Sequence, residues 1–570
     1  MISREEALEA VAGRHFEVVV IGGGITGAAV ALDAASRGYS TALLEGRDYG
    51  FGTSSKSSKM VHGGLRYLEN FDLGLVREAL IERQLMVRLA PHLVYPTPYL
   101  VPSFDGERPD RKVSLGLNAY DVLASGRRGA GPPLPGERRR LGRPAEAEGG
   151  WSPDRHRTID GSEVVEMAPA LAGRDPDSAF LFYDCQTDDV RLLLTALEEA
   201  ERYGAVCLNR AEVLEVSASG LRVDRVAFTD GESGERIEVG ADNVVNATGV
   251  WADLIRPGEI ESDEGVPRIR PSRGTHLLLS TEALDMGQAA CVMPAGDGRS
   301  IFALPWYDRT LVGTTDLDYE GPLDSIEAPE SDLEYLLDAV NSFFGTSLTD
   351  SDPVGAFAGV RPLISTGDPK KSVDISRRAE LYETSSGMLT ITGGKLTTWR
   401  RMGQQAVDRI VERAGRNAPC LTAEIPLGME VAPAELDPPE GVDESALSQL
   451  AFRYGHQARE VLDLARRDPE LAGPVVPGRP DLMAEVAWAV DAQQARSLED
   501  VFLRRTRLGL TAASDLTDPD LIAPVAELVG RRLGWGRRRR KAEVEAWRET
   551  VRREGLAPGL SGTGTPVATQ

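Results

Sequence analysis

Residues 16–46 decide the fold of this chain and read FEVVVIGGGITGAAVALDAASRGYSTALLEG. The uncharged run within them, residues 18–32, is 15 residues long, whereas a bilayer-spanning helix needs roughly 20 apolar residues. Three consecutive glycines also weaken a continuous helix. We therefore expect a buried β-strand over 18–21, a glycine turn, a helix over Ile25–Ser36 and a second strand over 40–44.

The glycines of this stretch have the spacing of a nucleotide-binding turn. Gly22, Gly24 and Gly27 fit G-x-G-x-x-G, which permits a tight bend, close approach of backbone to a pyrophosphate and close packing of helix on strand. The N-terminus of the helix favours negative charge. Glu45 ends the second strand and can accept hydrogen bonds from ribose hydroxyls. An ordinary strand–turn–helix is the alternative, but the glycines, strand and acid together favour FAD or NAD over NADP.

Length and charge limit the classes of function. With 570 residues, two or three domains are expected. The formal charge of −24 repels nucleic acid, so we expect no nucleic-acid partner. Only seven of the 64 basic residues are lysines. An acid-rich, lysine-poor composition indicates a halophilic protein, and the alternative is an acidic enzyme from an arginine-rich proteome.

The cysteines and the N-terminus indicate a reducing compartment. The four cysteines stand apart, without any C-x-x-C pair, so the usual zinc or iron–sulfur spacings are excluded and no metal site is expected. They also form no disulfide framework, which is consistent with the cytoplasm. The leader MISREEALEA is acidic, unlike a secretory signal peptide.

Two later segments repeat the combination of a buried strand and a turn of small residues. The segment NVVNATG has a strand over 243–246, and LTITGGKLTT has a strand over 389–392 followed by a helix start. Small residues at the carboxyl end of a strand let a ligand approach closely, although an ordinary strand end is the alternative. The residues that we assign to the cofactor here are Ala247, Thr248, Gly249, Gly393, Gly394, Leu396 and Thr397.

Several segments together resemble one enzyme family. In order, they are GGGITG, GFGTSSKSSKMVHGGLRYLE, NATGVWAD, PWYDRTLVGTTD, GVRPL, GGKLTTWR and LRRTRLGL. This order closely resembles the FAD-dependent, quinone-linked glycerol-3-phosphate dehydrogenases, from about residue 16 to about residue 550. The first glycine motif occurs in many proteins, so the resemblance rests on HGGLRYLE, GTTD and GGKLTT.

The resemblance implies a reaction and a fold. FAD would be the cofactor, and sn-glycerol 3-phosphate would be oxidised to dihydroxyacetone phosphate by hydride transfer from C2 to flavin N5. The fold class would be α/β, with a discontinuous Rossmann-like FAD-binding domain, a β-rich substrate domain and an α-helical C-terminal domain. We divide the chain into FAD-binding segments 16–105, 186–255 and 381–420, substrate-domain segments 106–185 (an excursion rich in Pro, Gly and Arg) and 256–380, a helical domain 425–555 and a disordered tail 556–570.

The resemblance also implies a phosphate-binding pocket. Arginine suits a phosphate because its planar fork binds oxygens in pairs and stays charged. Arg66 and Tyr67 in HGGLRYLE, Arg361 in GVRPL and Arg377 in DISRR match the substrate-pocket positions of the family. Thr314 in GTTD would orient the substrate through its hydroxyl. Each of these residues has an ordinary surface or strand role as its alternative.

Proton transfer and flavin contacts are assigned in the same way. His276 in RGTHLLLS is the expected proton acceptor, and His62 in VHGG would lie near the flavin. A structural, hydrogen-bonded histidine is the alternative for each. Lys395 would compensate negative charge near the reduced flavin or hold the substrate. The family pattern assigns hydroxyls and backbone N–H groups near the FAD phosphates to Thr53, Ser54 and Ser55.

The electron acceptor stays open at this point. A membrane quinone implies peripheral attachment to the inner face of the cell membrane, in glycerol catabolism. The anaerobic branch of the family carries a cysteine-rich cluster region, but this chain has only Cys420 beyond residue 300, so partner electron-transfer subunits would have to supply any cluster. The alternatives are an oxidase using oxygen, an oxidoreductase of another small hydroxy or amino acid, and a non-enzymatic FAD scaffold. The oligomeric state is also open, with a homodimer among the alternatives.

Overall fold

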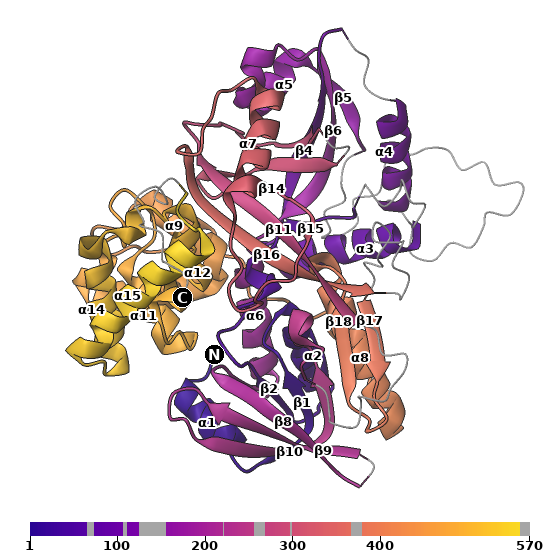
Figure 1. Cartoon of the computed structure of the whole chain (residues 1–570), viewed down its shortest axis with the longest axis vertical. Helices are drawn as coiled ribbons and strands as arrows, with labels where there is room; N and C mark the ends of the chain where they lie inside the picture. The colour runs from indigo at the N-terminus through magenta and orange to yellow at the C-terminus, as the bar shows by residue number, and fades with distance from the viewer. Residues whose placement is uncertain are drawn as a thin grey trace, which may run out of the picture.

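The computed structural model contains two β-sheets and a group of helices near the C-terminus, shown in orange and yellow in Figure 1. It describes residues 1–64, 73–106, 111–124, 155–220, 222–255, 268–296, 299–365 and 379–558. The segments that hold Arg66, Tyr67 and Arg377 lie outside these residues, as do most of the Pro/Gly/Arg-rich excursion and the last twelve residues of the predicted tail, 559–570.

The helices of the described part of the chain divide between the sheets and the C-terminal group. They are α1 (Arg4–Val11), α2 (Ile25–Ser36), α3 (Leu73–Leu89), α4 (Arg111–Ala124), α5 (Gly161–Met167), α6 (Asp189–Arg202), α7 (Glu330–Phe344), α8 (Trp399–Ala414), α9 (Glu444–Tyr454), α10 (Ala458–Arg467), α11 (Met483–Ala492), α12 (Leu498–Arg504), α13 (Leu508–Thr511), α14 (Pro519–Leu533) and α15 (Arg537–Glu554).

The first sheet contains the two strands of the stretch 16–46. Its strands are β1 (His15–Ile21), β2 (Thr41–Leu44), β7 (Val206–Leu208), β8 (Ala211–Ser219), β9 (Arg222–Asp230), β10 (Arg236–Asn246), β17 (Ala379–Glu383) and β18 (Leu389–Gly393). The main order is β17-β18-β10-β1-β2-β7, and β1 pairs in parallel with both β2 and β10. The predicted helix is confirmed as α2, with the predicted bounds. The strands before and after it, β1 and β2, differ from their predicted starts by three residues and one residue.

Both faces of β1 are covered, which explains its continuous apolar run. Val18 and Val20 pack into the core that contains α2, α6 and α8, whereas Val19 and Ile21 pack into the core with α1 and the β8–β10 strands. Alternate residues of a strand point to opposite faces, so a strand buried on both faces is apolar throughout. Because β1, β10 and β18 are parallel neighbours, their carboxyl ends meet at one edge of the sheet.

The second sheet has ten strands. They are β3 (Met60–Val61), β4 (Tyr95–Ser103), β5 (Arg157–Asp160), β6 (Ser178–Gln186), β11 (Arg268–Ser280), β12 (Ala290–Pro294), β13 (Ser300–Trp306), β14 (Arg309–Gly313), β15 (Leu317–Asp318) and β16 (Pro353–Ser365). Our division by sequence put β3 and β4 in the first FAD-binding segment, yet both pair with β6 here. Pairing between such distant segments leaves no local pattern, which is why the sequence did not reveal it.

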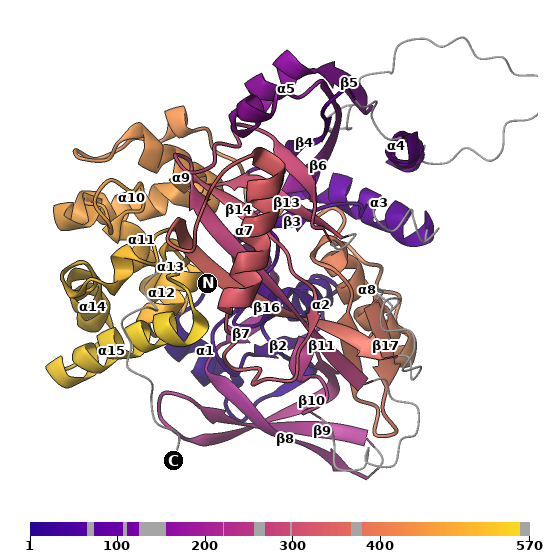
Figure 2. The same cartoon turned by 45° about the horizontal axis from the view of Figure 1, so that its top comes forward.

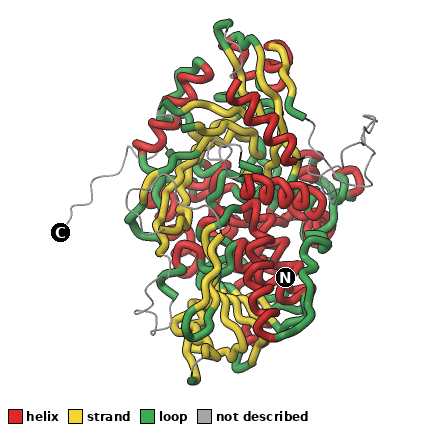
Figure 3. Tube along the Cα trace, turned by 90° about the vertical axis from the view of Figure 1, so that its right-hand side faces the viewer, coloured by secondary structure: helices red, strands yellow, loops and turns green. Residues whose placement is uncertain are grey.

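Alternation along β11 separates two environments. Leu277 and Leu279 pack towards α7, which lies over this sheet in Figure 2. Leu278 faces the other way, into the core of the C-terminal helices. His276 has the same parity as Leu278 and therefore lies on the face turned towards those helices. Figure 3 shows strands of the two sheets towards opposite ends of the molecule, with helices between them.

The C-terminal helices α9–α15 share one core with one face of the second sheet. The backbone also joins them, because the Ala356 amide on β16 donates to the carbonyl of Leu556, just after α15 (3.0 Å). No helix in the described ranges is long and apolar enough to cross a bilayer. The shared core and the backbone hydrogen bond show that the C-terminal region packs directly on the second sheet.

Candidate cofactor and substrate site

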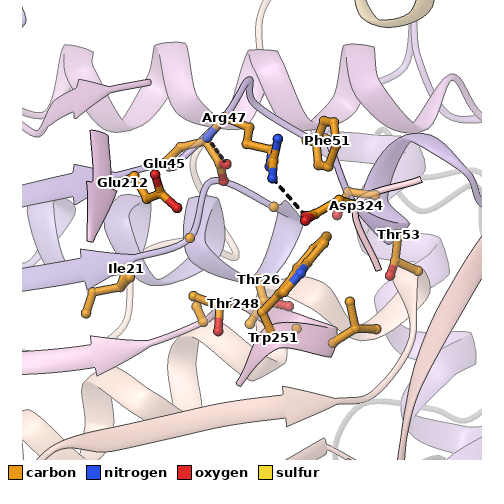
Figure 4. Close-up of a pocket in the computed structure, with 18 of the residues that line it drawn as sticks. Ile21, Thr26, Glu45, Arg47, Phe51, Thr53, Glu212, Thr248, Trp251 and Asp324 are labelled. Carbon is orange, nitrogen blue, oxygen red and sulfur yellow. Dashed lines mark hydrogen bonds and ion pairs between the residues drawn. The ribbon is translucent and has the colours of Figure 1, made fainter. Parts of the chain in front are cut away.

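A cavity of about 850 Å³ opens where β1, β2, β10 and β18 end (Figure 4). The parallel strand arrangement places this edge where open α/β sheets bind their ligands. Twelve of the residues singled out by sequence line the cavity: Gly22, Gly24, Glu45, Thr53, Ser54, Ala247, Thr248, Gly249, Gly393, Gly394, Lys395 and Leu396. The three strand ends predicted separately from sequence therefore meet at one site.

The glycine turn is required by close packing. Gly22 has φ of 108°, and a Cβ there would lie 2.7 Å from the carbonyl oxygen of Ala247. A Cβ on Gly27 would lie 1.8 Å from the carbonyl oxygen of Gly22, so Gly27 serves helix–strand packing and does not line the cavity. Gly24 is the N-cap of α2, and the Ile25 amide behind it donates to Ser54 Oγ at 3.0 Å.

Glu45 is held rigidly at the end of β2. Its Oε2 accepts a hydrogen bond from the Gly23 amide (2.6 Å), and its Oε1 accepts one from the Arg47 amide (2.7 Å). Burial raises the pKa of this carboxyl group. Each carboxylate oxygen keeps a second lone pair for a ligand hydroxyl. The cavity, the glycine turn, the open helix N-terminus and this acid together fit a dinucleotide cofactor.

Residues that sequence reasoning missed border the cavity. Arg47 forms an ion pair with Asp324 at 2.9 Å, and its guanidinium lies 4.9 Å from the ring centroid of Phe51. Figure 4 shows this pair near Trp251, whose ring lies 6.2 Å from that of Phe51. Trp251 belongs to the motif NATGVWAD and could have been found there. Asp324 lies in a distant loop and carries no local signal.

Three of the predicted substrate residues gather on one face of the second sheet. His276 is opposite Phe357 in the β11–β16 pairing, and Arg361 is opposite Ser272 on the same face. Nη2 of Arg361 donates to Thr314 Oγ1 (3.2 Å), and its Nη1 donates to Asp316 Oδ1 (3.0 Å). Asp316 is the aspartate of GTTD, although it was not singled out from sequence.

Glycines make room for these side chains. A Cβ on Gly274 would lie 2.6 Å from both the Arg361 guanidinium and Thr314 Oγ1, and one on Gly313 would lie 2.3 Å from the His276 ring. Neither glycine was assigned from sequence, although Gly313 is the first residue of GTTD. Gly274 and Gly313 are therefore required sterically, because a side chain at either position would fill the space that Arg361 or His276 occupies.

His276 is buried and neutral. Its ring stacks on Phe357 with 4.8 Å between centroids and 11° between planes, and its Nε2 lies 2.9 Å from Ser58 Oγ. Burial, together with the positive charges of Lys59 and Arg361, holds the pKa of His276 well below its ordinary value of 6.5. A neutral imidazole in such a place can accept a proton.

The serine loop, residues 53–59, links the two halves of the site. Thr53 Oγ1 donates to the carbonyl of Val360 at 2.5 Å, one residue before Arg361. Ser55 is buried, and its Oγ donates to the Gly52 carbonyl (3.4 Å). It does not line the cavity, contrary to its assigned cofactor contact. The cause is that η1 (Thr53–Ser55) turns its third residue inward.

His62 and Thr397 contact each other rather than the cavity. The Thr397 hydroxyl accepts from the His62 amide (3.0 Å) and donates to the His62 carbonyl (3.1 Å). This bridge joins the segment after β3 to η6 (Leu396–Thr398), next to Lys395, which lines the cavity. Fold and cavity together define a dinucleotide-binding protein of the open α/β type. The face of the second sheet that carries His276, Arg361 and Thr314 is the predicted substrate face.

Comparison with protein families and with known proteins identifies the family of this chain. The family model described as "FAD dependent oxidoreductase" matches residues 17–400, and the one described as "C-terminal domain of alpha-glycerophosphate oxidase" matches residues 388–540. Glycerol-3-phosphate dehydrogenase 1 of Mycobacterium tuberculosis is 38% identical over 510 residues, 87% of this chain and 92% of that protein. Glycerol-3-phosphate dehydrogenase 2 of the same organism is 35% identical over 93% of this chain and 87% of that protein.

A solved structure agrees with these relatives. The glycerol-3-phosphate dehydrogenase of Bacillus halodurans complexed with FAD superposes with a TM-score of 0.75 at 25% identity, covering 97% of each chain. The L-α-glycerophosphate oxidase of Mycoplasma pneumoniae shares the fold at 14% identity, with a TM-score of 0.52, over 70% of this chain and 95% of that one. The chain therefore belongs to the family of FAD-dependent glycerol-3-phosphate dehydrogenases, as its motifs predict.

Proposed function

We propose that this protein oxidises sn-glycerol 3-phosphate to dihydroxyacetone phosphate and passes the electrons to a membrane quinone in glycerol catabolism. The observation that carries the proposal is the grouping of His276, Arg361 and Thr314 on one sheet face, tied through Thr53 to the cofactor cavity. FAD, when bound, supplies the acceptor for the hydride that leaves C2 of the substrate.

The protein's own residues bind and deprotonate the substrate. Arg361 binds the phosphate with its charged fork, while Thr314 donates or accepts at a substrate hydroxyl. His276 takes the proton of the C2 hydroxyl, because its low pKa keeps it unprotonated at working pH. The family resemblance also assigns Arg66, Tyr67 and Arg377, which lie outside the described residues, to binding of the substrate anion, and it assigns His62 a place near the flavin.

The cofactor is held mainly by backbone. Gly22 and Gly24 admit the pyrophosphate to the N-terminus of α2, and Glu45 accepts from the adenosine ribose. Lys395 lines the cavity and would compensate negative charge on a reduced flavin bound there. The remaining cofactor contacts come from the serine loop and the other strand ends: Thr53, Ser54, Ala247, Thr248, Gly249, Gly393, Gly394 and Leu396.

Quinone as acceptor requires contact with the membrane surface. Helices α3 and α4 pack on each other at the side of the second sheet (Figure 1). They expose four large apolar side chains: Leu73, Ile81, Leu115 and Val122. Such apolar groups suit shallow insertion into a bilayer interface, whereas the net charge of −24 is repelled by anionic headgroups. We therefore place this side against the inner face of the cell membrane.

The basic run at the start of α15 is a weaker membrane candidate. Arg539 pairs with Glu543 at 2.8 Å, and Arg540 pairs with Glu527. These pairs neutralise the run locally, which supports a solvated helix face rather than a lipid contact. Washing isolated membranes with high salt and then with mild detergent tests the two contacts. Release by detergent but not by salt is expected for apolar insertion.

One anaerobic spectrum tests the reaction itself. The purified holoenzyme should lose its flavin absorbance near 450 nm when sn-glycerol 3-phosphate is added without oxygen. A spectrum unchanged by saturating substrate would defeat the proposal. Reoxidation by a water-soluble quinone, compared with reoxidation by oxygen, decides the acceptor. The match to the oxidase C-terminal domain makes the second measurement necessary, and rapid stoichiometric consumption of oxygen would favour an oxidase.

A further inference from the structure

A cluster of buried charges lies beneath the serine loop and reaches it from two other parts of the chain. Lys59 belongs to the loop, Asp189 opens helix α6, and Arg507 precedes α13 in the C-terminal region. All three side chains are fully buried. Lys59 Nζ donates to Asp189 Oδ2 at 2.6 Å, and Arg507 Nη2 donates to Asp189 Oδ1 at 3.1 Å.

The cluster also binds the backbone of the loop. The Ser55 carbonyl accepts from both Lys59 Nζ (2.6 Å) and Arg507 Nη2 (3.1 Å). Asp189 Oδ2 accepts from the Ser57 amide (3.1 Å) and from Ser57 Oγ (2.7 Å). The loop is therefore held at Ser55, Ser57 and Lys59. Ser58 lies between the last two and has little conformational freedom.

Such a cluster is poorly explained by stability alone. Taking paired charges out of water costs free energy that their attraction repays only with excellent geometry. Lys59 and Arg507 also have left-handed backbones, with φ of 59° and 67°, which non-glycine residues adopt only when the surroundings impose it. Burial lowers the pKa of Lys59 to about 8. These charges instead hold the backbone of the serine loop in one conformation.

The held residue is Ser58, and it faces His276. Its Oγ lies 2.9 Å from His276 Nε2, while Lys59 Nζ lies 4.9 Å from the centroid of Phe357, the ring on which His276 stacks. Nδ1 of His276 has no hydrogen-bond partner among the described residues. The hydrogen bond with Ser58 at Nε2 is thus the one that holds this ring among the described residues, and the direction in which the hydroxyl makes it sets which ring nitrogen carries the proton.

We propose that Ser58 is a positioning residue that fixes the orientation and tautomer of His276, and that Lys59, Asp189 and Arg507 hold Ser58 in place. The C-terminal helical region thereby contributes to the substrate site through Arg507. This inference rests on the proposed function, since it takes His276 as the proton acceptor. It adds four residues to which the family motifs in this chain gave no role.

Replacing Ser58 by alanine tests the first step. Ser58→Ala should retain its FAD but lower kcat about 10- to 100-fold with little change in KM, because orienting a general base contributes to the rate of chemistry. Ser280→Ala is the matched control. It removes a hydroxyl from the far end of β11, where its partner is the Ala283 amide, and it should leave kcat unchanged.

A spectroscopic measurement separates positioning from loosened structure. The chain has six histidines, so the holoenzyme labelled with 15N-histidine can be assigned by the loss of one spin system in His276→Gln. Wild type should show a single neutral tautomer for His276, and Ser58→Ala should shift both ring nitrogens towards the average of two tautomers. The charged groups acting on this ring are Lys59 and Arg361, and both remain in the variant.

A double variant tests the second step. Lys59→Met should lower kcat in the same way, and adding Ser58→Ala to it should lower kcat by less than twofold more, since residues acting through one contact are not additive. Effects that multiply would overturn the role of the cluster. Ser58→Ala decides the first step even if Lys59→Met is recovered without flavin.

The outcomes distinguish this inference from the proposed function. Wild-type holoenzyme that is not reduced by sn-glycerol 3-phosphate defeats both. Normal reduction of the wild type, combined with unchanged kcat and unchanged His276 nitrogen shifts in Ser58→Ala, overturns only the inference. A loss of kcat accompanied by unchanged nitrogen shifts would likewise count against it, because the hydroxyl would then act elsewhere.

Discussion

The cofactor edge of the first sheet and the substrate face of the second are built on opposite principles. The cofactor edge is made of strand ends, glycines and backbone amides, with Glu45 held between two of those amides. The substrate face is made of side chains, in which His276 and Arg361 occupy space left by Gly313 and Gly274. The first surface should therefore be sensitive to added volume, and the second to lost charge or hydrogen bonding.

A second difference concerns what holds each surface in place. Burial of β1 on both faces supports the cofactor edge. The substrate face depends in addition on ion pairs from the C-terminal region, among them the pair between Lys56 of the serine loop and Glu554 at the end of α15 (2.8 Å). Charge pairs respond to protonation and to screening by salt, whereas apolar burial involves no charges to protonate or screen. The two surfaces should therefore respond differently to mutation, pH and salt.

The largest expected effect is on the cofactor edge. Gly24→Val places a branched side chain at the N-cap of α2, on the border of the cavity, where an added Cβ alone would lie 3.1 Å from Ser54 Oγ. Little flavin should remain bound, because the side chain would meet the pyrophosphate. The ratio of absorbance at 450 nm to that at 280 nm measures this.

A matched glycine controls for the helix cap. Gly536 is the N-cap of α15, has an extended backbone like Gly24 and has open space around its Cβ position. Gly536→Val should keep a full complement of flavin. Normal flavin content in Gly24→Val would show that the cofactor edge is not limited by volume and would break the comparison.

The second prediction concerns charge on the substrate face. Arg361→Ala should lower kcat/KM for sn-glycerol 3-phosphate about 10- to 150-fold, since a charge-assisted hydrogen bond to phosphate is worth about 1.5–3 kcal/mol. The flavin should stay bound. Arg225→Ala, which removes an exposed arginine paired with Glu238, is the control and should have no effect. An unchanged kcat/KM in Arg361→Ala would exclude this residue from substrate binding.

The third prediction concerns pH. Because burial lowers the pKa of His276 below 6.5, the ring stays unprotonated as the pH falls towards that value and remains able to accept a proton. The kcat at saturating substrate should therefore be nearly level from about pH 8 to about pH 6.5, with its acid limb lower still. An acid limb centred at or above about pH 7 would mean that an exposed histidine, or another group, is the base.

The smallest expected effect is that of salt on stability. In about 1 M KCl the Debye length is about 3 Å, so repulsion among exposed carboxylates is screened while buried pairs are screened much less. If the composition reflects a halophilic host, the melting temperature should hold or rise with KCl. A steady fall would reject the halophilic interpretation and show that surface ion pairs dominate. The enzymatic proposal does not depend on the result.

The sequence by itself determined the cofactor edge because its signals are local. The strand, the glycine turn, helix α2 and Glu45 lie within 31 residues, and each constraint acts between neighbours in the chain. Family motifs also located His276, Arg361 and Thr314, which the structure brings together. The segments of Arg66, Tyr67 and Arg377 lie outside the described residues, and their part in the pocket stays a prediction.

Only the tertiary structure decided what surrounds these residues. Ser55 was assigned to the cofactor, yet its side chain turns inward. Its carbonyl oxygen accepts hydrogen bonds from Lys59 and Arg507 of the buried cluster. Arg507 donates to that carbonyl from 452 residues away in the sequence. Asp316, in the connection between β14 and β15, pairs with Arg361 of β16. Sequence spacing reports contacts made along a strand or a helix turn. Contacts between distant segments depend on how the sheets and helices pack, and a single sequence holds no periodic signal for that packing.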